Sequence, residues 1–316
     1  MRTTRRVNRI AGRSAAALAM FALAGSPPPL MAQWTSDEWL EEPVDRATFE
    51  SWRPFFSYDA GLPFDLRSIS VEEDEGIRVE RVAFTSTAGE TVFADYYAVR
   101  AARRDRPHVV LVHGGLRSGK ESVRPIATLL VRRGYGVIAI DMPYFGERDT
   151  GLLRSFDEAD KHEHLYNRPS TYQEWVLQII RDAGRTIDLL VEHYGASPGR
   201  IAYVAFSRGA QVGYMVVGAE PRFRAAALMY GGHFDRGETG HLAAACPANY
   251  IGRIAPRPLW LLNGTFDGDY DRKRSVEPLH RHAGEPTEVV WVETGHQLPR
   301  LEDLERMADW LGSVME

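Results

Sequence analysis

The chain has 316 residues, of which 44% are hydrophobic and 26% charged, with a formal net charge of −5. This length allows a large buried core, and the mild acidity gives no sign of a nucleic-acid or anionic-membrane partner. The one cysteine, Cys246, excludes an internal disulfide and is interpreted as a small packing residue.

The first 32 residues are typical of an export signal. Five arginines precede the apolar stretch from Ala15 to Ala24, which is too short to span a bilayer. Cleavage is expected after Ala24 or after Ala32, because small residues precede both points. Thr4-Arg5-Arg6 leaves the general and the twin-arginine routes open, and a disordered basic tail is the alternative interpretation. We therefore expect residues 1–32 to be a signal peptide and the protein to be periplasmic or secreted, with no membrane span.

The next segment shows no sustained periodicity. Residues 33–76 are rich in Trp, Phe, Pro and acidic groups, which indicates a short helix and an extended wrap over the core. Two strand-like runs follow, Ile77–Thr85 and Thr91–Val99. Their short connection contains Gly89, and this predicts a hairpin.

After the hairpin, apolar strands alternate with helical segments. Thr171–Glu174 resembles a capping box at the start of one amphipathic helix, and a helix from Leu301 is expected to close the chain. This alternation predicts an α/β fold with a doubly wound, mainly parallel sheet and an antiparallel N-terminal hairpin. A polar interruption, residues 143–170, is expected to be an insertion above the strand ends. The expected strands are Val109–Val112, Val137–Ile140, Ile201–Phe206, Ala225–Tyr230, Leu259–Leu262 and Thr287–Val292.

Polar residues with catalytic chemistry follow several of these strands. In such sheets, ligands bind outside the carboxyl ends of the strands. Ser207 follows an apolar run directly and precedes a helix-compatible segment, which favours a sharp turn that exposes its hydroxyl. Asp267 follows one later strand, and His296 follows the last. A nucleophile, an acid and a base therefore occur in that order at one edge of the sheet.

Residues 77–316 resemble the α/β-hydrolase superfamily. The resemblance is carried by the turn at His113-Gly114-Gly115, the elbow at Ser207, Gly264 three residues before Asp267, and Gly295-His296 near the C-terminus. The pattern is most similar to the esterase, dienelactone-hydrolase and acetylxylan-esterase branches.

The resemblance implies a catalytic triad. Ser207 would attack an acyl carbon, His296 would take its proton, and Asp267 would orient the imidazole. Asp269 and Asp271 lie close enough in sequence to take the role of Asp267, although the spacing from Gly264 favours Asp267.

The oxyanion would be held by backbone N–H groups of Arg208 and of Gly115 or Leu116. The elbow departs from Gly-x-Ser-x-Gly, because Ala205 replaces the first glycine while Gly209 is retained. The Arg208 side chain leaves two alternatives, preference for an anionic substrate or an ion pair within the protein.

The loop after Asp141 is expected to line the pocket. Tyr144 and Phe145 are candidate walls of the acyl pocket, although aromatic loop residues also serve simply in packing. His233 is a further candidate substrate-binding residue, since it follows a strand.

The sequence also contains patterns that resemble two other types of site. Residues 114–120 match most of a phosphate-binding loop, but Glu121 stands where Mg²⁺ binding needs Ser or Thr. His162-Glu163-His164 and His280-Arg281-His282 resemble metal ligands, but such spacing points two side chains to one face only on a strand. The sequence therefore favours solvated charge over a metal site.

The sequence thus predicts an exported serine hydrolase that cleaves a small carboxylic ester through an acyl-enzyme, without cofactor or metal. A peptidase or acyltransferase on the same fold and a catalytically inactive binding protein are the alternatives. The amino-acid sequence does not indicate the oligomeric state.

Overall fold

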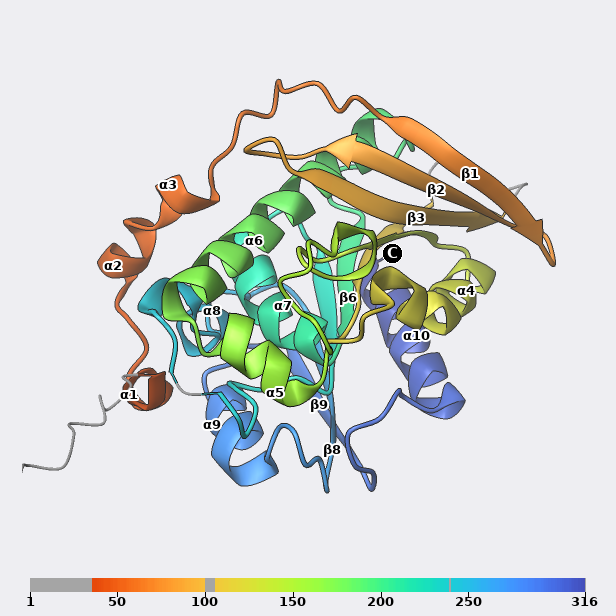
Figure 1. Ribbon diagram of the computed structural model, residues 1–316. Coiled ribbons are helices and arrows are strands. Elements are labelled where there is room, and N and C mark those ends of the chain that lie inside the picture. Colours follow the sequence, from red (N-terminus) through yellow and green to blue (C-terminus); the bar gives the residue numbers. More distant parts are fainter. Residues whose placement is uncertain (1–35, 100–105, 239, 316) are drawn as a thin grey trace, which may run out of the picture. The chain divides into compact units, whose positions relative to one another are not determined.

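The sheet has nine strands in the order β1-β2-β3-β5-β4-β6-β7-β8-β9. β1, β2 and β3 form one end of this sheet (Figure 1). The computed structural model describes residues 36–99, 106–238 and 240–315, so the predicted signal peptide lies outside the described residues. β1, β2, β3 and β5 are joined by antiparallel pairing, and all pairs from β5 to β9 are parallel. This confirms the predicted fold class.

Most strands lie where the sequence places them. β2, β3, β6 and β9 have the predicted bounds, and β4, β5, β7 and β8 differ from theirs by one or two residues at an end. The bounds are β1 Arg67–Asp74, β2 Ile77–Thr85, β3 Thr91–Val99, β4 His108–Val112, β5 Gly136–Ile140, β6 Ile201–Phe206, β7 Ala225–Met229, β8 Leu259–Gly264 and β9 Thr287–Val292.

β1 is the strand that the sequence did not predict. All eight of its residues are exposed, so it has no buried face to impose an apolar-polar alternation. It pairs only with β2, in antiparallel register from Arg67 opposite Ala83 to Asp74 opposite Ile77. Part of the segment interpreted as a wrap is therefore the edge of the sheet.

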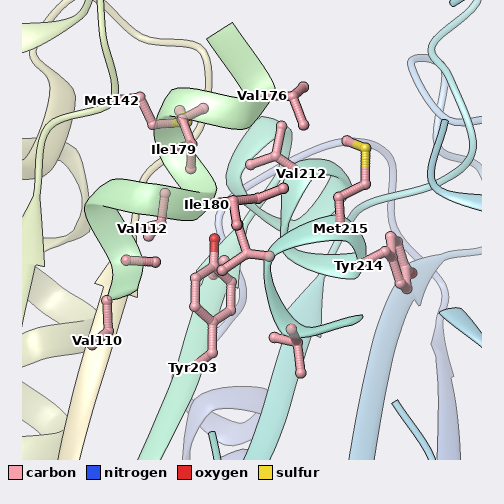
Figure 2. Close-up of a cluster of buried hydrophobic side chains, with 14 of the residues drawn as sticks. Val110, Val112, Met142, Val176, Ile179, Ile180, Tyr203, Val212, Tyr214 and Met215 are labelled. Carbon is pink, nitrogen blue, oxygen red and sulfur yellow. The ribbon is translucent and has the colours of Figure 1, made fainter. Parts of the chain in front are cut away.

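Helices cover both faces of the sheet, because successive buried residues of each central strand point to opposite sides. On one face Val110, Val112 and Tyr203 pack against α6 and α7 (Figure 2). On the other, Val109 and Leu111 belong to a second core with α4 and α10. The helices are α1 Ser36–Glu41, α2 Arg46–Glu50, α3 Arg53–Phe56, α4 Arg124–Arg132, α5 Glu158–Lys161, α6 Pro169–Glu192, α7 Arg208–Ala219, α8 Ala248–Ile251, α9 Glu277–His280 and α10 Leu301–Met315, with shorter 3-10 or π turns η1 Gly119–Val123, η2 Gly146–Arg148, η3 His162–Tyr166, η4 Ala243–Ala245 and η5 Arg272–Val276.

The predicted capping box at Thr171–Glu174 is wrong. The capping box would make Thr171 the N-cap, but the N-cap of α6 is Arg168, three residues earlier, and it makes no side-chain capping hydrogen bond; the helix begins at Pro169. Proline suits this first position because its fixed φ is helical and its missing N–H would have no partner there.

The first three helices pack near α8, which lies about 200 residues further along the chain. The Val44 N–H donates to Asn249 Oδ1 at 2.9 Å, and Arg253 Nη2 donates to the Val44 carbonyl at 2.8 Å. Phe49 meets Tyr250 edge to face with ring centroids 5.1 Å apart. These contacts make residues 36–56 part of the folded body.

Within the described ranges, none of the helices combines the length and the apolar character that crossing a bilayer requires.

Candidate active site

Ser207 lies at a sharp turn between β6 and α7. Its φ of 55° and ψ of −121° belong to a region that L-residues rarely adopt, which is typical of strain kept at a functional position. The turn is held by the Ser207 N–H, which donates to the Met229 carbonyl of β7 at 2.8 Å. Gly209 is required here, because a β-carbon at that position would lie 2.4 Å from the His113 carbonyl oxygen.

The loops after β8 and β9 bring an acid and a base to this serine. His296 Nε2 lies 2.8 Å from Ser207 Oγ, and His296 Nδ1 lies 2.9 Å from Asp267 Oδ2. Gly264 permits the two loops to touch, since a β-carbon there would lie 2.5 Å from the Thr294 carbonyl oxygen. The three side chains therefore form one continuous hydrogen-bonded chain.

The hydrogen bonds around Asp267 determine which ring nitrogen of His296 carries the proton. Asp267 Oδ1 accepts the backbone N–H groups of Asp269 and Tyr270 at 2.8 and 2.9 Å, which fixes the carboxylate. The carboxylate cannot donate when ionised, so His296 Nδ1 carries the proton and Nε2 is free to accept from the serine. Such an arrangement can activate a hydroxyl as a nucleophile.

The other two candidate acids are placed differently. The Asp269 carboxylate is 3.8 Å from His296 Nε2, on the serine side of the ring, and is 42% exposed. Asp271 accepts the backbone N–H groups of Lys273 and Arg274 at the start of η5. Of the three, Asp267 alone is hydrogen-bonded to His296 Nδ1.

The candidate oxyanion donors lie beside Ser207. Arg208 is the first residue of α7, and the first N–H groups of a helix have no partner within it. Across the pocket, Gly114 lies against the serine, because a β-carbon on it would be 3.0 Å from Ser207 Cβ. Gly115 and Leu116 continue this loop along the pocket wall.

The Arg208 side chain pairs with acids of the protein. It is buried and donates to Asp235 Oδ2 at 2.5 Å, to Glu238 Oε1 at 2.7 Å and to Gln211. Its guanidinium carbon also lies 3.7 Å from the centre of the Tyr166 ring. Of the two alternatives left by the sequence, the structure therefore shows the internal ion pair.

This ion pair shifts the ionisation of both acids. Burial is the largest single effect and opposes their ionisation. The charge of Arg208, together with the hydrogen bonds of His162 to Asp235 and of His241 to Glu238, outweighs burial and holds the pKa of both acids below their usual values. Carboxyls with lowered pKa values contribute stability that is present above their unfolded-state pKa values, near 4, and is lost as the pH falls further.

We expect Arg208→Met to lower the free energy of unfolding by about 3 to 5 kcal/mol at pH 7, because it leaves two buried carboxylates without their cation. This difference in the free energy of unfolding should shrink as the pH falls below 5, because the two carboxyls then take up protons in the folded variant. Urea unfolding of the variant and the wild type across this pH range measures the difference.

The control is Arg306→Met, which breaks a surface ion pair with Glu288. The two side chains of this pair are 57% and 42% exposed. Its expected cost is under about 1 kcal/mol. Equal losses in the two variants would contradict the prediction.

A cavity of about 280 Å³ opens onto Ser207 and His296. This volume lies at the lower end of ligand pockets and suits a small substrate. Several of its wall residues were not predicted. The lining consists of Gly114, Gly115, Leu116, Glu158, Lys161, Tyr166, Phe206, Ser207, Arg208, Asp235, Asp269, Tyr270, His296, Gln297 and Leu298.

The three predicted substrate-binding residues lie away from this lining. Phe145 is fully buried and packs against His113, Phe156 and Trp175. Tyr144 lines a separate polar cavity of about 200 Å³ with Arg148. His233 is fully buried, and its Nε2 lies 3.0 Å from Cys246 Sγ. None of the three therefore lines the cavity at Ser207, because Phe145 and His233 pack in the protein interior and Tyr144 faces a different cavity.

The insertion supplies the wall in their place. Glu158, Lys161 and Tyr166 belong to α5 and η3, within the predicted insertion at residues 143–170. The sequence predicted an insertion above the strand ends, but the charged and aromatic residues of this segment have no periodic pattern that could single out these three.

The motif resembling a phosphate-binding loop has an internal role. Lys120 is buried, and its ammonium donates to Asp141 Oδ2 at 2.7 Å and to Glu147. Asp141 also accepts the backbone N–H groups of Lys120 and Glu147. The lysine therefore ties two loops together at the end of β5.

One group of side chains has the composition of a metal site. Among the described residues, ligand atoms of Glu158, His162 and Asp235 lie within 4.8 Å of one another. Asp235 is already paired with Arg208, and His162 Nε2 lies 2.7 Å from Asp235 Oδ1. The guanidinium beside this group would repel a metal cation, so an ion-pair network accounts for it better.

A family model described as "Alpha/beta hydrolase family" matches residues 109–314, and the chain belongs to this family. No curated protein has a matching sequence.

Several solved structures share the fold. An acetyl xylan esterase from Paenibacillus sp. R4 is 14% identical with a TM-score of 0.66, over 88% of this chain and 99% of that one. A cold-adapted esterase from an Arctic intertidal metagenomic library is 20% identical with a TM-score of 0.62, over 81% and 100%. Acetyl xylan esterase 1 from Thermoanaerobacterium sp. JW/SL YS485 is 14% identical with a TM-score of 0.62, over 88% and 97%. At these identities the likeness concerns the fold.

Proposed function

We propose that this protein is an exported serine hydrolase that cleaves small carboxylic esters through an acyl-enzyme. The observation that carries the proposal is the hydrogen-bonded chain from Ser207 Oγ through His296 to Asp267 at the mouth of the cavity. The expected export signal in residues 1–32 supports the location, and the esterases that share the fold are consistent with the reaction type.

In the first half of the reaction, Ser207 Oγ attacks the ester carbonyl carbon while its proton passes to His296 Nε2. The carbonyl oxygen becomes an oxyanion, which accepts hydrogen bonds from the N–H of Arg208 and from that of Gly115 or Leu116. Each such donor contributes about 3 kcal/mol to transition-state stabilisation. Asp267 stabilises the imidazolium that has formed. The bond to the alkoxy oxygen then breaks, and the alcohol leaves with the proton from His296.

In the second half, a water molecule enters the position of the alcohol. His296 takes a proton from the water, the resulting oxygen nucleophile attacks the acyl carbon, and the bond to Ser207 Oγ breaks. The serine recovers its proton from His296, and the carboxylic acid is released. All groups that this cycle needs are side chains and backbone N–H groups of the chain.

A fluorophosphonate probe tests the proposal directly, because it forms a covalent adduct only with an activated serine. We expect the native protein to take up one equivalent of probe and the adduct to map by mass spectrometry to the peptide containing Ser207. Protein unfolded in urea before probe addition is the control and should remain unlabelled. An unlabelled native protein, or an adduct on a different serine, would contradict the proposal.

Short p-nitrophenyl esters are the substrates of choice for the accompanying assay, since the cavity is small. Release of p-nitrophenol from the acetate ester is expected to be faster than from the octanoate ester. The opposite order would show that the acyl chain occupies space outside this cavity.

A further inference from the structure

Lys161 is buried in the wall of the pocket, although lysine side chains are seldom buried in proteins. Its side chain is 5% exposed, and its ammonium donates to the Gly115 carbonyl at 3.1 Å and to Glu158 Oε1 at 2.5 Å. A hydrogen bond from a charged donor is stronger than one between neutral groups. The insertion therefore holds the loop that carries the candidate oxyanion donors.

The helix that carries Lys161 is itself well anchored. The Asp157 carboxylate caps α5 by accepting the Asp160 N–H at 2.8 Å. In turn, Asp160 Oδ2 accepts the N–H groups of Arg154, Ser155 and Phe156 at 2.8 to 3.1 Å. These bonds fix the backbone on the N-terminal side of the lysine.

The residue after Lys161 connects the same segment to the elbow. His162 Nε2 lies 2.7 Å from Asp235 Oδ1, and Asp235 Oδ2 accepts from Arg208, the residue that follows the nucleophile. Burial opposes protonation of His162, but the hydrogen bond and charge of Asp235 outweigh it, and its pKa is raised. Lys161 thus contacts one side of the oxyanion site directly, and His162 is linked to the other side through Asp235 and the Arg208 side chain.

We propose that Lys161 is a positioning residue for the oxyanion hole, holding the Gly115 carbonyl so that the Leu116 N–H is directed for the transition state. The inference rests on the proposed function. A peptide unit is planar and trans, so its C=O and N–H point in opposite directions. An ammonium that fixes the Gly115 carbonyl therefore also fixes the Leu116 N–H, and it polarises that N–H into a better donor.

The glycine at position 115 agrees with this role. A β-carbon there would lie 3.3 Å from Lys161 Nζ and 3.2 Å from Tyr166 Oη, both tighter than ordinary contact. The absence of a side chain lets the ammonium approach the backbone.

The test compares Lys161→Met, which removes the charge at similar length, with Lys161→Arg, which retains a cationic donor. We expect Lys161→Met to lower kcat for p-nitrophenyl acetate by about 10- to 100-fold, since small misplacements of catalytic groups have effects of this size. KM should stay within about twofold, because the bond acts on the transition state. Lys161→Arg should recover most of the loss. Lys273→Met, at an exposed lysine in η5, is the matched control and should match the wild type.

Binding of a boronic acid provides a readout that a purely structural role would not give. Boronic acids form a tetrahedral adduct with the serine, so their affinity should fall by the same factor as kcat, with the melting temperature as a check of folding. Unchanged kcat and boronate affinity, or a loss confined to KM, would overturn the inference. Lys161→Gln replaces Lys161→Met if the latter does not fold.

Failure of this inference can be told apart from failure of the proposed function. A wild type that hydrolyses esters, with equal activity in Lys161→Met, leaves the proposed function standing and removes the role of Lys161. A second measurement is independent of activity. Amide hydrogen exchange across residues 114–120 should be faster in Lys161→Met than in Lys161→Arg, and equal exchange would overturn the inference whatever the enzyme assay shows.

Discussion

Ser207→Ala should lower kcat for p-nitrophenyl acetate by about 10⁵- to 10⁶-fold, because it removes the atom that forms the acyl bond. Residual hydrolysis would come from the remaining backbone donors and His296 acting on water. The fold should be unaffected, since the side chain change removes one oxygen and alanine has the same backbone preferences at φ 55°. Kinetics of the variant purified in parallel with the wild type measure the effect.

A second serine provides the control for this experiment. Ser313→Ala removes an exposed hydroxyl in α10 that donates to the Trp310 carbonyl, and its activity should equal that of the wild type. Activity of Ser207→Ala within tenfold of the wild type would rule out the proposed acyl-enzyme at this residue.

Asp267→Asn should lower kcat by about 10⁴-fold through the tautomer of His296. The backbone N–H groups of Asp269 and Tyr270 bind Oδ1 of Asp267, so an asparagine would turn its carbonyl oxygen toward them. Its NH₂ group would then face His296 Nδ1, which would have to accept. The proton would move to Nε2, where it blocks acceptance from Ser207.

Asp269→Asn is the matched variant for this second prediction. Asp269 is two residues away and partly exposed, and it lies on the opposite side of the imidazole, 3.8 Å from Nε2. We expect a change in kcat of less than about tenfold, since its removal leaves the bond from Asp267 to Nδ1 intact. A larger loss for Asp269→Asn than for Asp267→Asn would reverse the assignment of the acid. Steady-state kinetics of the two variants at pH 7 decide between them.

Much of the fold could be predicted because its central strands, β4 to β8, are buried on both faces and form continuous apolar runs in the sequence. The parallel topology then places the ends of β6, β8 and β9 at one edge, which is why Ser207, Asp267 and His296 could be grouped before their distances were known. β1 could not be predicted, because neither of its faces is buried. Its exposed residues leave no trace of burial in the sequence.

The pocket wall could not be predicted because long-range polar contacts determine it. The segment that brings Lys161 and Tyr166 to the cavity is held by distant partners: His162 pairs with Asp235, 73 residues away, and the Asn167 amide donates to the Gly237 carbonyl. Tyr144 and Phe145 follow a strand end as expected, yet packing against Trp175 draws Phe145 inward. Local patterns carry no information about such pairings.

The contacts of the N-terminal helices with α8 have a consequence for the order of folding. Val44 contacts Asn249, and Phe49 contacts Tyr250. These contacts cannot form until about 200 further residues have been synthesised. Contacts between residues so distant in sequence slow folding, since a long loop must close before they form. Residues 36–56 should therefore stay loosely folded until residues 249–253 are available to pack against them.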